Sequence, residues 1–370
     1  MKRLCLILAM IGCAGPAVAE APPKKLENIS QAAVQSAFQV LRSEYIRNGE
    51  LTYEELNRAA LQGLLQRLHL GAELIDKEGA KLPVLPTGVL SEMLTDEIAY
   101  LRPLSYAENE IPALEKALAD YHARKVPHLI LDLRTPAAPG EFRIAASLLD
   151  LFMPRGQMLF RLKQVAKEDS ELFISNREPT WPGNLVVLAD EETNNLGETI
   201  AAVLKQSGRA IIMGSQTRGA SVRYETVPLD DRWLLRFAHA EMLLSDGTSL
   251  FGNGLKPDFQ VMLPVAVKRQ IFAIPDGVTS VRDMIFDRAR PRYNEAALVA
   301  RKNPELELYI RQSQSNQTDD ATEPPKDTVL QRAVDMINAR GHLHAFKMQW
   351  SASQSGGKPT VRKAEPATEP

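Results

Sequence analysis

The apolar residues near the start of the chain recur at the spacing of a helix. In residues 28–70 the first apolar stripe advances in steps of three and four, along Val34, Phe38, Leu41 and Tyr45. Thr52 is followed by Glu55, a pair typical of a capping box, which predicts that a second helix begins there. The apolar face of this second helix consists of Leu56, Ala60, Leu64 and Leu68. We therefore expect a helical region at the start of the mature chain.

Farther along the chain, short apolar runs alternate with amphipathic segments. The apolar runs predict strands at residues 97–104, 128–134, 184–190, 209–215 and 233–244. The amphipathic segments predict helices at residues 111–125, 141–153 and 196–208. Continuous apolar runs are typical of strands covered on both faces, and strand–helix alternation is typical of a parallel or mixed sheet. The expected fold class is therefore α/β, a mixed sheet with flanking helices.

These patterns divide the chain into segments of different character. We expect a signal peptide at 1–19, an N-terminal helical region at 20–80, an α/β core at 88–265, a C-terminal helical extension at 266–312, a linker at 313–326, a helix at 327–345 and a disordered tail at 351–370. Asp327 is the expected N-cap of the last helix. The linker and the tail are polar and hold too few apolar residues to form a core.

The first residues have the three parts of a secretory signal. Lys2 and Arg3 precede an apolar run at 4–11, and small residues follow up to Ala19. The sequence therefore predicts cleavage after Ala19 and export to the periplasm or the extracellular space, with acylation of Cys13 as the less favoured alternative. The chain's two cysteines, Cys5 and Cys13, both lie in this leader, so we expect no disulfide in the mature chain.

The composition argues against several classes of partner. A formal net charge of −2 gives no reason to expect nucleic acid or an anionic membrane as a partner. No glycine-rich phosphate loop follows a predicted strand, so we expect no nucleotide and no other cofactor. The histidines at 342–344, and the set of His128, His239 and Glu241, are interpreted as ordinary surface or sheet positions.

Five segments occur in the order found in one peptidase family. They are LNRAALQGLLQRL at 56–68, HLILDLRTPAAPGEFRIAASLLDLFMPRGQMLF at 128–160, NLVVLADEETNNLGETIAAVLKQSGRAIIMGSQTRGASVRY at 184–224, SDGTSLFGNGLKPDFQV at 245–261 and DTVLQRAVDMI at 327–337. In this order they resemble the carboxyl-terminal processing (tail-specific) serine peptidases. The resemblance implies the core of that family, with its crotonase-like ββα units, and a serine-type peptidase that uses a serine–lysine dyad.

The residues that carry the family's chemistry differ in this chain. The resemblance assigns the nucleophile position to Asn195, the base position to Ala220 and the position that orients the lysine to Tyr224. The dyad needs a hydroxyl and a neutral amine, and neither residue type is present at these positions. We therefore expect the catalytic dyad to be lost.

Two further features of the family are altered. Its oxyanion-binding region falls on Ala138, Pro139 and Gly140, and proline has no N–H to donate. The family carries a peptide-binding PDZ domain between its helical region and its core, but here only residues 71–90 lie between those parts. We expect the PDZ domain to be absent.

Three interpretations of function remain open from the sequence. The favoured one is a non-catalytic pseudopeptidase that binds extended peptides or envelope proteins, with Arg218 and Arg223 beside Ala220 as candidates to bind an acidic group. The second is an active peptidase with relocated residues, drawn from Thr193, Ser221 and Lys205. The third is a structural envelope protein.

Overall fold

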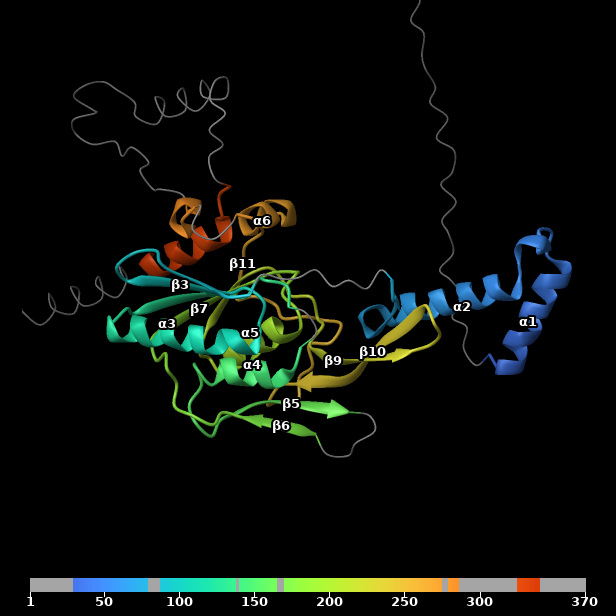
Figure 1. Ribbon diagram of the computed structural model, residues 1–370, viewed down its shortest axis with the longest axis horizontal. Coiled ribbons are helices and arrows are strands. Elements are labelled where there is room, and N and C mark those ends of the chain that lie inside the picture. The colour runs from blue at the N-terminus through green and yellow to red at the C-terminus, as the bar shows by residue number, and fades with distance from the viewer. Residues whose placement is uncertain are drawn as a thin grey trace, which may run out of the picture. The chain divides into compact units, whose positions relative to one another are not determined.

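The chain divides into two compact units, Met1–Leu68 and His69–Pro370. The computed structural model describes residues 29–78, 87–137, 140–164, 170–274, 279–285 and 325–339 (Figure 1). The leader and the predicted tail at 351–370 lie outside the described residues. So do residues 286–312 of the predicted C-terminal extension, residues 313–324 of the predicted linker and residues 340–345 of the predicted last helix.

The first unit is made of helices. It contains α1 (Gln31–Glu44), the short 3₁₀ helix η1 (Asn48–Glu50) and α2 (Tyr53–Leu68). The Thr52 Oγ1 accepts a hydrogen bond from the Glu55 backbone N at 3.1 Å, so the capping residue expected from the sequence does begin α2. No residue of α1 is buried, and Leu56 is the single buried residue of α2.

The second unit is built around a six-stranded mixed sheet. Its strands, in spatial order, are β11 (Phe259–Gln260), β8 (Ile211–Gly214), β7 (Asn184–Ala189), β4 (His128–Asp132), β3 (Ile98–Pro103) and β2 (Val89–Met93). Neighbouring strands from β11 to β3 are parallel, and β2 runs antiparallel to β3. The expectation of a mixed α/β sheet is confirmed.

Helices cover both faces of this sheet (Figure 1). One face packs with α3 (Ile111–Ala123), α4 (Phe142–Leu149) and α5 (Asn195–Gln206) in the larger core cluster. The other face packs with η4 (Val281–Met284) and a helix at 328–339, next to α6 (Val265–Phe272). In β4, Leu129 and Leu131 belong to the first cluster and Ile130 to the second, which explains why the strand is apolar throughout.

A second, antiparallel sheet contains the other strands that the structure describes. They are β1 (Ala72–Asp76), β5 (Met158–Gln164), β6 (Glu171–Ile174), β9 (Val222–Pro228) and β10 (Trp233–Leu243). The long β10 pairs with β9, with β1 near its start and with β5 near its end. Its pairing with β9 is irregular between Ala238 and Ala240. Among the described helices, none is long and apolar enough to cross a membrane.

Candidate functional site

The candidate site lies where three loops meet at the carboxyl ends of the parallel strands. The loop at 133–137 follows β4, the loop at 190–194 joins β7 to α5, and the loop at 215–221 joins β8 to β9. The carboxyl ends of parallel strands are the usual place for ligands in open α/β sheets. The first and second loops touch directly, because the Asn194 Oδ1 accepts a hydrogen bond from the Ala137 backbone N at 2.9 Å.

Asn195 is the first residue of α5 and contacts the third loop. Its side-chain Nδ2 donates to the Val222 carbonyl oxygen at 2.8 Å and lies 3.5 Å from the Ala220 carbonyl oxygen. The structure thus brings Asn195 into contact with Ala220, 25 residues away in the chain; the resemblance assigns these two residues to the nucleophile and base positions. Asn195 is 4% exposed and has a φ of 42°, in the left-handed region that asparagine adopts more readily than most residues.

The amide of Asn195 has one satisfied end and one that lacks a partner. Its Nδ2 faces two carbonyl oxygens, which fixes the orientation of the amide, because the opposite orientation would set oxygen against oxygen. Its Oδ1 is buried and finds no hydrogen-bond donor within the described part of the chain. A buried acceptor without a partner has a free-energy cost of about 1–3 kcal/mol.

Glu198 organises the loop that carries Ala220. Its carboxylate accepts hydrogen bonds from the backbone N atoms of Gly219 at 2.6 Å and Ala220 at 2.8 Å. It also accepts from the hydroxyls of Ser221, at 2.7 Å, and Thr217. Glu198 is fully buried, one turn into α5. It therefore holds the loop at 217–221 against the helix that begins with Asn195.

The hydroxyls and the amine considered for relocated catalysis are engaged elsewhere. The Thr193 Oγ1 donates to the Leu133 carbonyl oxygen at 3.1 Å, and the Ser221 Oγ donates to Glu198. Both residues are fully buried. The Lys205 Nζ, near the far end of α5, donates to the Lys256 carbonyl oxygen at 2.7 Å and pairs with Asp258. The structure brings none of these hydroxyls to a lysine amine within the residues described.

The side chains that flank Ala220 point to different partners. The Tyr224 hydroxyl donates to the Leu70 carbonyl oxygen at 3.0 Å, and burial raises the pKa of this hydroxyl. Arg223 pairs with Glu171, with 2.9 Å between Nη1 and Oε2, so its charge is already matched. Arg218 is exposed, and its side chain makes no ion pair with any residue the structure describes. Of the two arginines singled out from the sequence, Arg218 is the one available to a ligand.

The oxyanion region is only partly described. Ala138 and Pro139 lie outside the described residues, and Gly140 is half-buried. The neighbouring Ala137 N–H is already bound to the Asn194 side chain.

A buried lysine beside this site was not recognised from the sequence. Lys268 of α6 is 2% exposed, and its Nζ lies 2.7 Å from Asp190 Oδ2 and 2.6 Å from Glu192 Oε2. It also donates to the Arg134 carbonyl oxygen at 3.2 Å. Burial raises the pKa of the Asp190 carboxyl, and Lys268 offsets only part of that effect. Lys268 therefore ties α6 to two of the three loops of the site.

A second buried ionic cluster joins β4 to the helix at 328–339. The Arg134 guanidinium, 1% exposed, lies 2.6 Å from both Asp132 Oδ2 and Asp327 Oδ2. Asp327 Oδ1 accepts from the backbone N atoms of Val329 and Leu330, so the N-cap predicted from the sequence is confirmed. The sequence offered no signal for the Arg134–Asp327 pair, because 193 positions separate the two residues.

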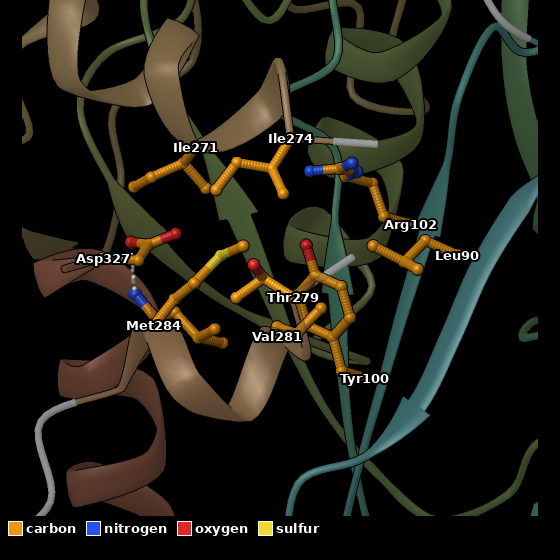
Figure 2. Close-up of a pocket in the computed structure, with 10 residues that line it drawn as sticks. Leu90, Tyr100, Arg102, Ile271, Ile274, Thr279, Val281, Met284 and Asp327 are labelled. Atoms are coloured by element: carbon orange, nitrogen blue, oxygen red, sulfur yellow. Dashed lines mark hydrogen bonds between the residues drawn. The ribbon is translucent and has the colours of Figure 1, made fainter. Parts of the chain in front are cut away.

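A small cavity lies behind this cluster and away from Asn195. Figure 2 shows Tyr100, Arg102 and Asp327 around a space lined otherwise mainly by apolar side chains of α6, η4 and β2. The cavity measures about 20 Å³, which is room for one water molecule. It is therefore too small for a peptide or a cofactor.

The histidines considered from the sequence do not form one site. His239 pairs with Glu225, with 3.0 Å between Nδ1 and Oε2. His128 lies beside Asn184 at the start of β4, while Glu241 lies near the end of β10. Within the described ranges no three His, Cys, Asp or Glu side chains are grouped to hold a metal ion, and the histidines at 342–344 lie outside those ranges.

Comparisons with known proteins identify the domain that carries these loops. The sequence pattern of peptidase family S41 matches residues 97–261. A carboxy-terminal-processing protease of Bartonella bacilliformis is 26% identical over 198 residues, which are 51% of this chain and 44% of the relative. The carboxy-terminal processing protease CtpA of Bacillus subtilis is 27% identical over 182 residues, 48% of this chain and 37% of the relative.

The solved structures that are similar to part of the chain include a photosystem II D1 C-terminal processing protease. It has 23% identity, a TM-score of 0.40, and coverage of 45% of this chain and 42% of that one. In these comparisons the chain spans less than half the length of the relatives. Residues 97–261 of this chain therefore form a domain of peptidase family S41.

Proposed function

We propose that this protein binds extended polypeptide beside Asn195 and does not hydrolyse it. The observation that carries the proposal is the pair of residues at the expected dyad positions. Asn195 offers an amide that donates to the Val222 carbonyl oxygen and lies 3.5 Å from the Ala220 carbonyl oxygen, and alanine carries no amine. A serine–lysine dyad requires a hydroxyl and an amine within about 2.6–3.2 Å of each other. An amide nitrogen is a poor nucleophile, because its lone pair is delocalised into the carbonyl group.

A missing serine–lysine dyad predicts a large loss of catalytic turnover. In serine peptidases, removal of the nucleophile or of the base alone lowers turnover by a factor on the order of 10⁶. That factor corresponds to roughly 8 kcal/mol of activation free energy. Thr193 and Ser221 supply no substitute, since each hydroxyl is buried and donates to an oxygen of the protein. No observation therefore favours a relocated active site.

The edge of β9 supports the binding part of the proposal. Within the described strands, β9 pairs with β10 alone, so its other edge is open to a further strand. This edge starts at Val222, whose carbonyl oxygen is the partner of Asn195. An extended peptide can add to such an edge through main-chain hydrogen bonds, which need neither serine nor lysine.

The chemistry of the expected peptide follows from Arg218. This exposed arginine lies two residues before Ala220, and its backbone N donates to the Thr193 carbonyl oxygen at 3.1 Å, which fixes its place in the site. A guanidinium without an acidic partner favours a carboxylate, either an acidic side chain or a free C-terminus. The preferred ligand is thus an extended peptide that carries a carboxylate.

The remaining parts of the proposal concern the whole chain. Its leader supports export to the periplasm or the extracellular space. In that compartment, unfolded or extended envelope polypeptides would be the partners. Twelve residues separate Asp76 at the end of β1 from Val89 at the start of β2, which supports the absence of a PDZ domain there. Without that domain we expect weak binding, because fewer contacts offset the ordering of the peptide.

Calorimetry with peptides tests this proposal. We expect the mature chain to bind extended peptides with acidic or free carboxyl ends. We expect Arg218→Ala to weaken that binding roughly 10- to 100-fold, since a charge-assisted hydrogen bond contributes about 1.5–3 kcal/mol. The matched control is Arg143→Ala, an exposed arginine on α4 that pairs with Glu108. If the parent chain binds no such peptide at millimolar concentration, the site is not a peptide-binding site and a structural role in the envelope becomes the better account.

A further inference from the structure

Lys268 of α6 has a partner for each of its side-chain N–H groups although it is almost fully buried. Its Nζ lies 2.7 Å from Asp190 Oδ2 and 2.6 Å from Glu192 Oε2, and it donates to the Arg134 carbonyl oxygen at 3.2 Å. An ammonium group has three donors, and these three oxygens use all of them. Lys268 therefore holds its partners in fixed positions, because moving one of them would leave a buried donor unpaired.

The two carboxylates lie in the loop between β7 and α5, one of the three loops of the candidate site. Asp190 Oδ1 accepts hydrogen bonds from the backbone N atoms of Glu192 at 3.0 Å and Thr193 at 3.1 Å. The Thr193 carbonyl oxygen in turn accepts a hydrogen bond from the Arg218 backbone N at 3.1 Å. Lys268 is therefore connected to Arg218 through one carboxylate and one turn of the backbone.

The loop after β4 is joined to the same network. It supplies the Arg134 carbonyl oxygen to Lys268, and it supplies the Leu133 carbonyl oxygen to the Thr193 hydroxyl, at 3.1 Å. Lys268 thus acts on all three loops of the site. It contacts two of them directly and reaches the third through Thr193 and Arg218.

The next residue of α6 provides a comparison. The Arg269 guanidinium lies 2.6 Å from Glu192 Oε1, so it contacts the same side chain as Lys268, but Arg269 is 71% exposed. An exposed ion pair is screened by water and contributes little, whereas a buried one is costly to break. The position of the loop between β7 and α5 therefore depends on Lys268 far more than on Arg269.

The surroundings of Asp190 show why the ammonium group of Lys268 matters. Burial raises the pKa of the Asp190 carboxyl, and the charges of Lys268 and Arg134 offset only part of that effect. Tyr106, in the segment before α3, lies near enough that the Asp190 charge adds to the rise in the pKa of its hydroxyl. Without Lys268 the carboxylates of Asp190 and Glu192 would repel each other. A protonated Asp190 would accept the hydrogen bonds of the turn less strongly.

We propose that Lys268 is a positioning residue for carboxylate recognition at the peptide site. It holds the loop between β7 and α5 in the position that presents Arg218 to the carboxylate of a bound peptide, and it does not itself touch the ligand. The proposal rests on the peptide binding proposed above and assigns a further residue to that site. The part of the ligand whose binding depends on Lys268 is the carboxylate and not the extended main chain.

Calorimetry on the mature chain with two forms of one peptide tests the proposal. The probes are an extended peptide with a free C-terminal carboxylate and the same peptide with a C-terminal amide. We expect the parent to prefer the carboxylate form roughly 10- to 100-fold, since Arg218 makes a charge-assisted hydrogen bond to it. Lys268→Gln removes the charge but keeps two donors, and it is expected to reduce this preference to about threefold or less. A purely structural defect would weaken both forms equally and leave the preference unchanged.

Hydrogen exchange separates a failure of this proposal from a failure of peptide binding. In the protein without peptide, the backbone amides of residues 190–194 and 215–221 should exchange about tenfold or more faster in Lys268→Gln than in the parent, since exchange reports local opening. If the parent binds neither peptide, the proposed function fails. In that case faster exchange still supports the positioning role of Lys268, and unchanged exchange overturns it.

Two further variants complete the test. Arg269→Gln is the matched control, because it makes the same replacement at the exposed neighbour, and it should keep the preference and the exchange rates of the parent. If circular dichroism shows that Lys268→Gln does not fold, Lys268→Arg takes its place. Its planar guanidinium cannot place three donors on the same three oxygens, so a reduced preference is expected here too. A folded Lys268 variant with the parent's preference would overturn the proposal, and so would a loss of preference in Arg269→Gln.

Discussion

Asn195 and Glu198 lie one turn apart on α5 and have opposite roles in the site. Asn195 holds a left-handed backbone conformation, and its buried Oδ1 lacks a partner within the described residues. Backbone strain and unsatisfied buried polar atoms raise the free energy of the folded state. They are often found at functional sites, where the surrounding structure holds the strained residue in place. Glu198 is part of that surrounding structure, because four donors from the loop at 217–221 converge on its carboxylate. Glu198 thus holds the loop at 217–221 beside Asn195.

The first prediction concerns Glu198. Glu198→Ala would leave the Gly219 and Ala220 N–H groups and two hydroxyls without their buried acceptor. We expect a loss of roughly 4 kcal/mol in the free energy of unfolding, since each unsatisfied buried group costs about 1–3 kcal/mol and the loop relaxes in part. Urea unfolding of the parent and of Glu198→Ala measures this loss. The exposed Glu178→Ala should change stability by less than about 0.5 kcal/mol, and an equally mild effect of Glu198→Ala would contradict the organising role of this residue.

At the scale of elements, buried ionic clusters join the carboxyl end of β4 to segments far along the chain. Arg134 binds Asp132 on β4 and Asp327 at the start of the helix at 328–339, while Lys268 of α6 binds the loop before α5. Burial alone would raise the pKa of Asp132, but the Arg134 guanidinium outweighs it and holds that pKa below its usual value. Asp132 therefore stabilises the fold while it is ionised.

The second prediction follows from the sign of that shift. A carboxyl whose pKa is lowered by folding contributes stability above its unfolded pKa of about 3.9 and loses that contribution as the pH falls through the folded value. Asp132→Asn should therefore lower the free energy of unfolding by roughly 3–5 kcal/mol at neutral pH, because Arg134 loses a buried partner. The difference from the parent should shrink below about pH 4.

Denaturant unfolding at several pH values checks this. Asp120→Asn on α3, whose carboxylate pairs with Arg124 at the surface, serves as the control with little effect at any pH. A difference between Asp132→Asn and the parent that grows on acidification would contradict a lowered pKa for Asp132 in the folded protein.

The sequence predicted some elements well and others not at all, for physical reasons. Strands such as β4 and β7 are buried on both faces, so they appear as continuous apolar runs, and α3 and α5 show clear helical periodicity. The strands β1, β6 and β9 are short and partly exposed, and their mixed residues gave no such signal. Contacts between distant residues, such as Lys268 with Asp190, depend on the tertiary fold and leave no local pattern.

The candidate site was predictable to the extent that spacing along the chain determines it. The contact between Asn195 and Ala220 follows the 25-residue spacing that the resemblance implies. The partners of Tyr224 and Arg223 are Leu70 and Glu171, which come from other strands or turns of the antiparallel sheet. No feature of the sequence indicated these partners. Because Arg223 pairs with Glu171, Arg218 is the one of the two candidate arginines that has no ion-pair partner among the described residues.

At the scale of the whole molecule, the chain combines a peptidase family S41 domain in its second unit with a first unit made of helices. The second unit carries its own apolar core and the open edge of β9 beside Asn195. The first unit exposes apolar side chains on both of its helices.

The measurement that tests the central claim most directly is a hydrolysis assay on the purified mature chain. Unfolded proteins and peptides with acidic or apolar C-termini are incubated with the parent and with Asn195→Ala, and products are analysed by mass spectrometry. We predict no cleavage by either protein above the rate without protein, because no hydroxyl–amine pair is present at the positions of Asn195 and Ala220. Cleavage by the parent would contradict the account. If Asn195→Ala retained it, the nucleophile would lie elsewhere; if Asn195→Ala abolished it, Asn195 itself would take part in the reaction.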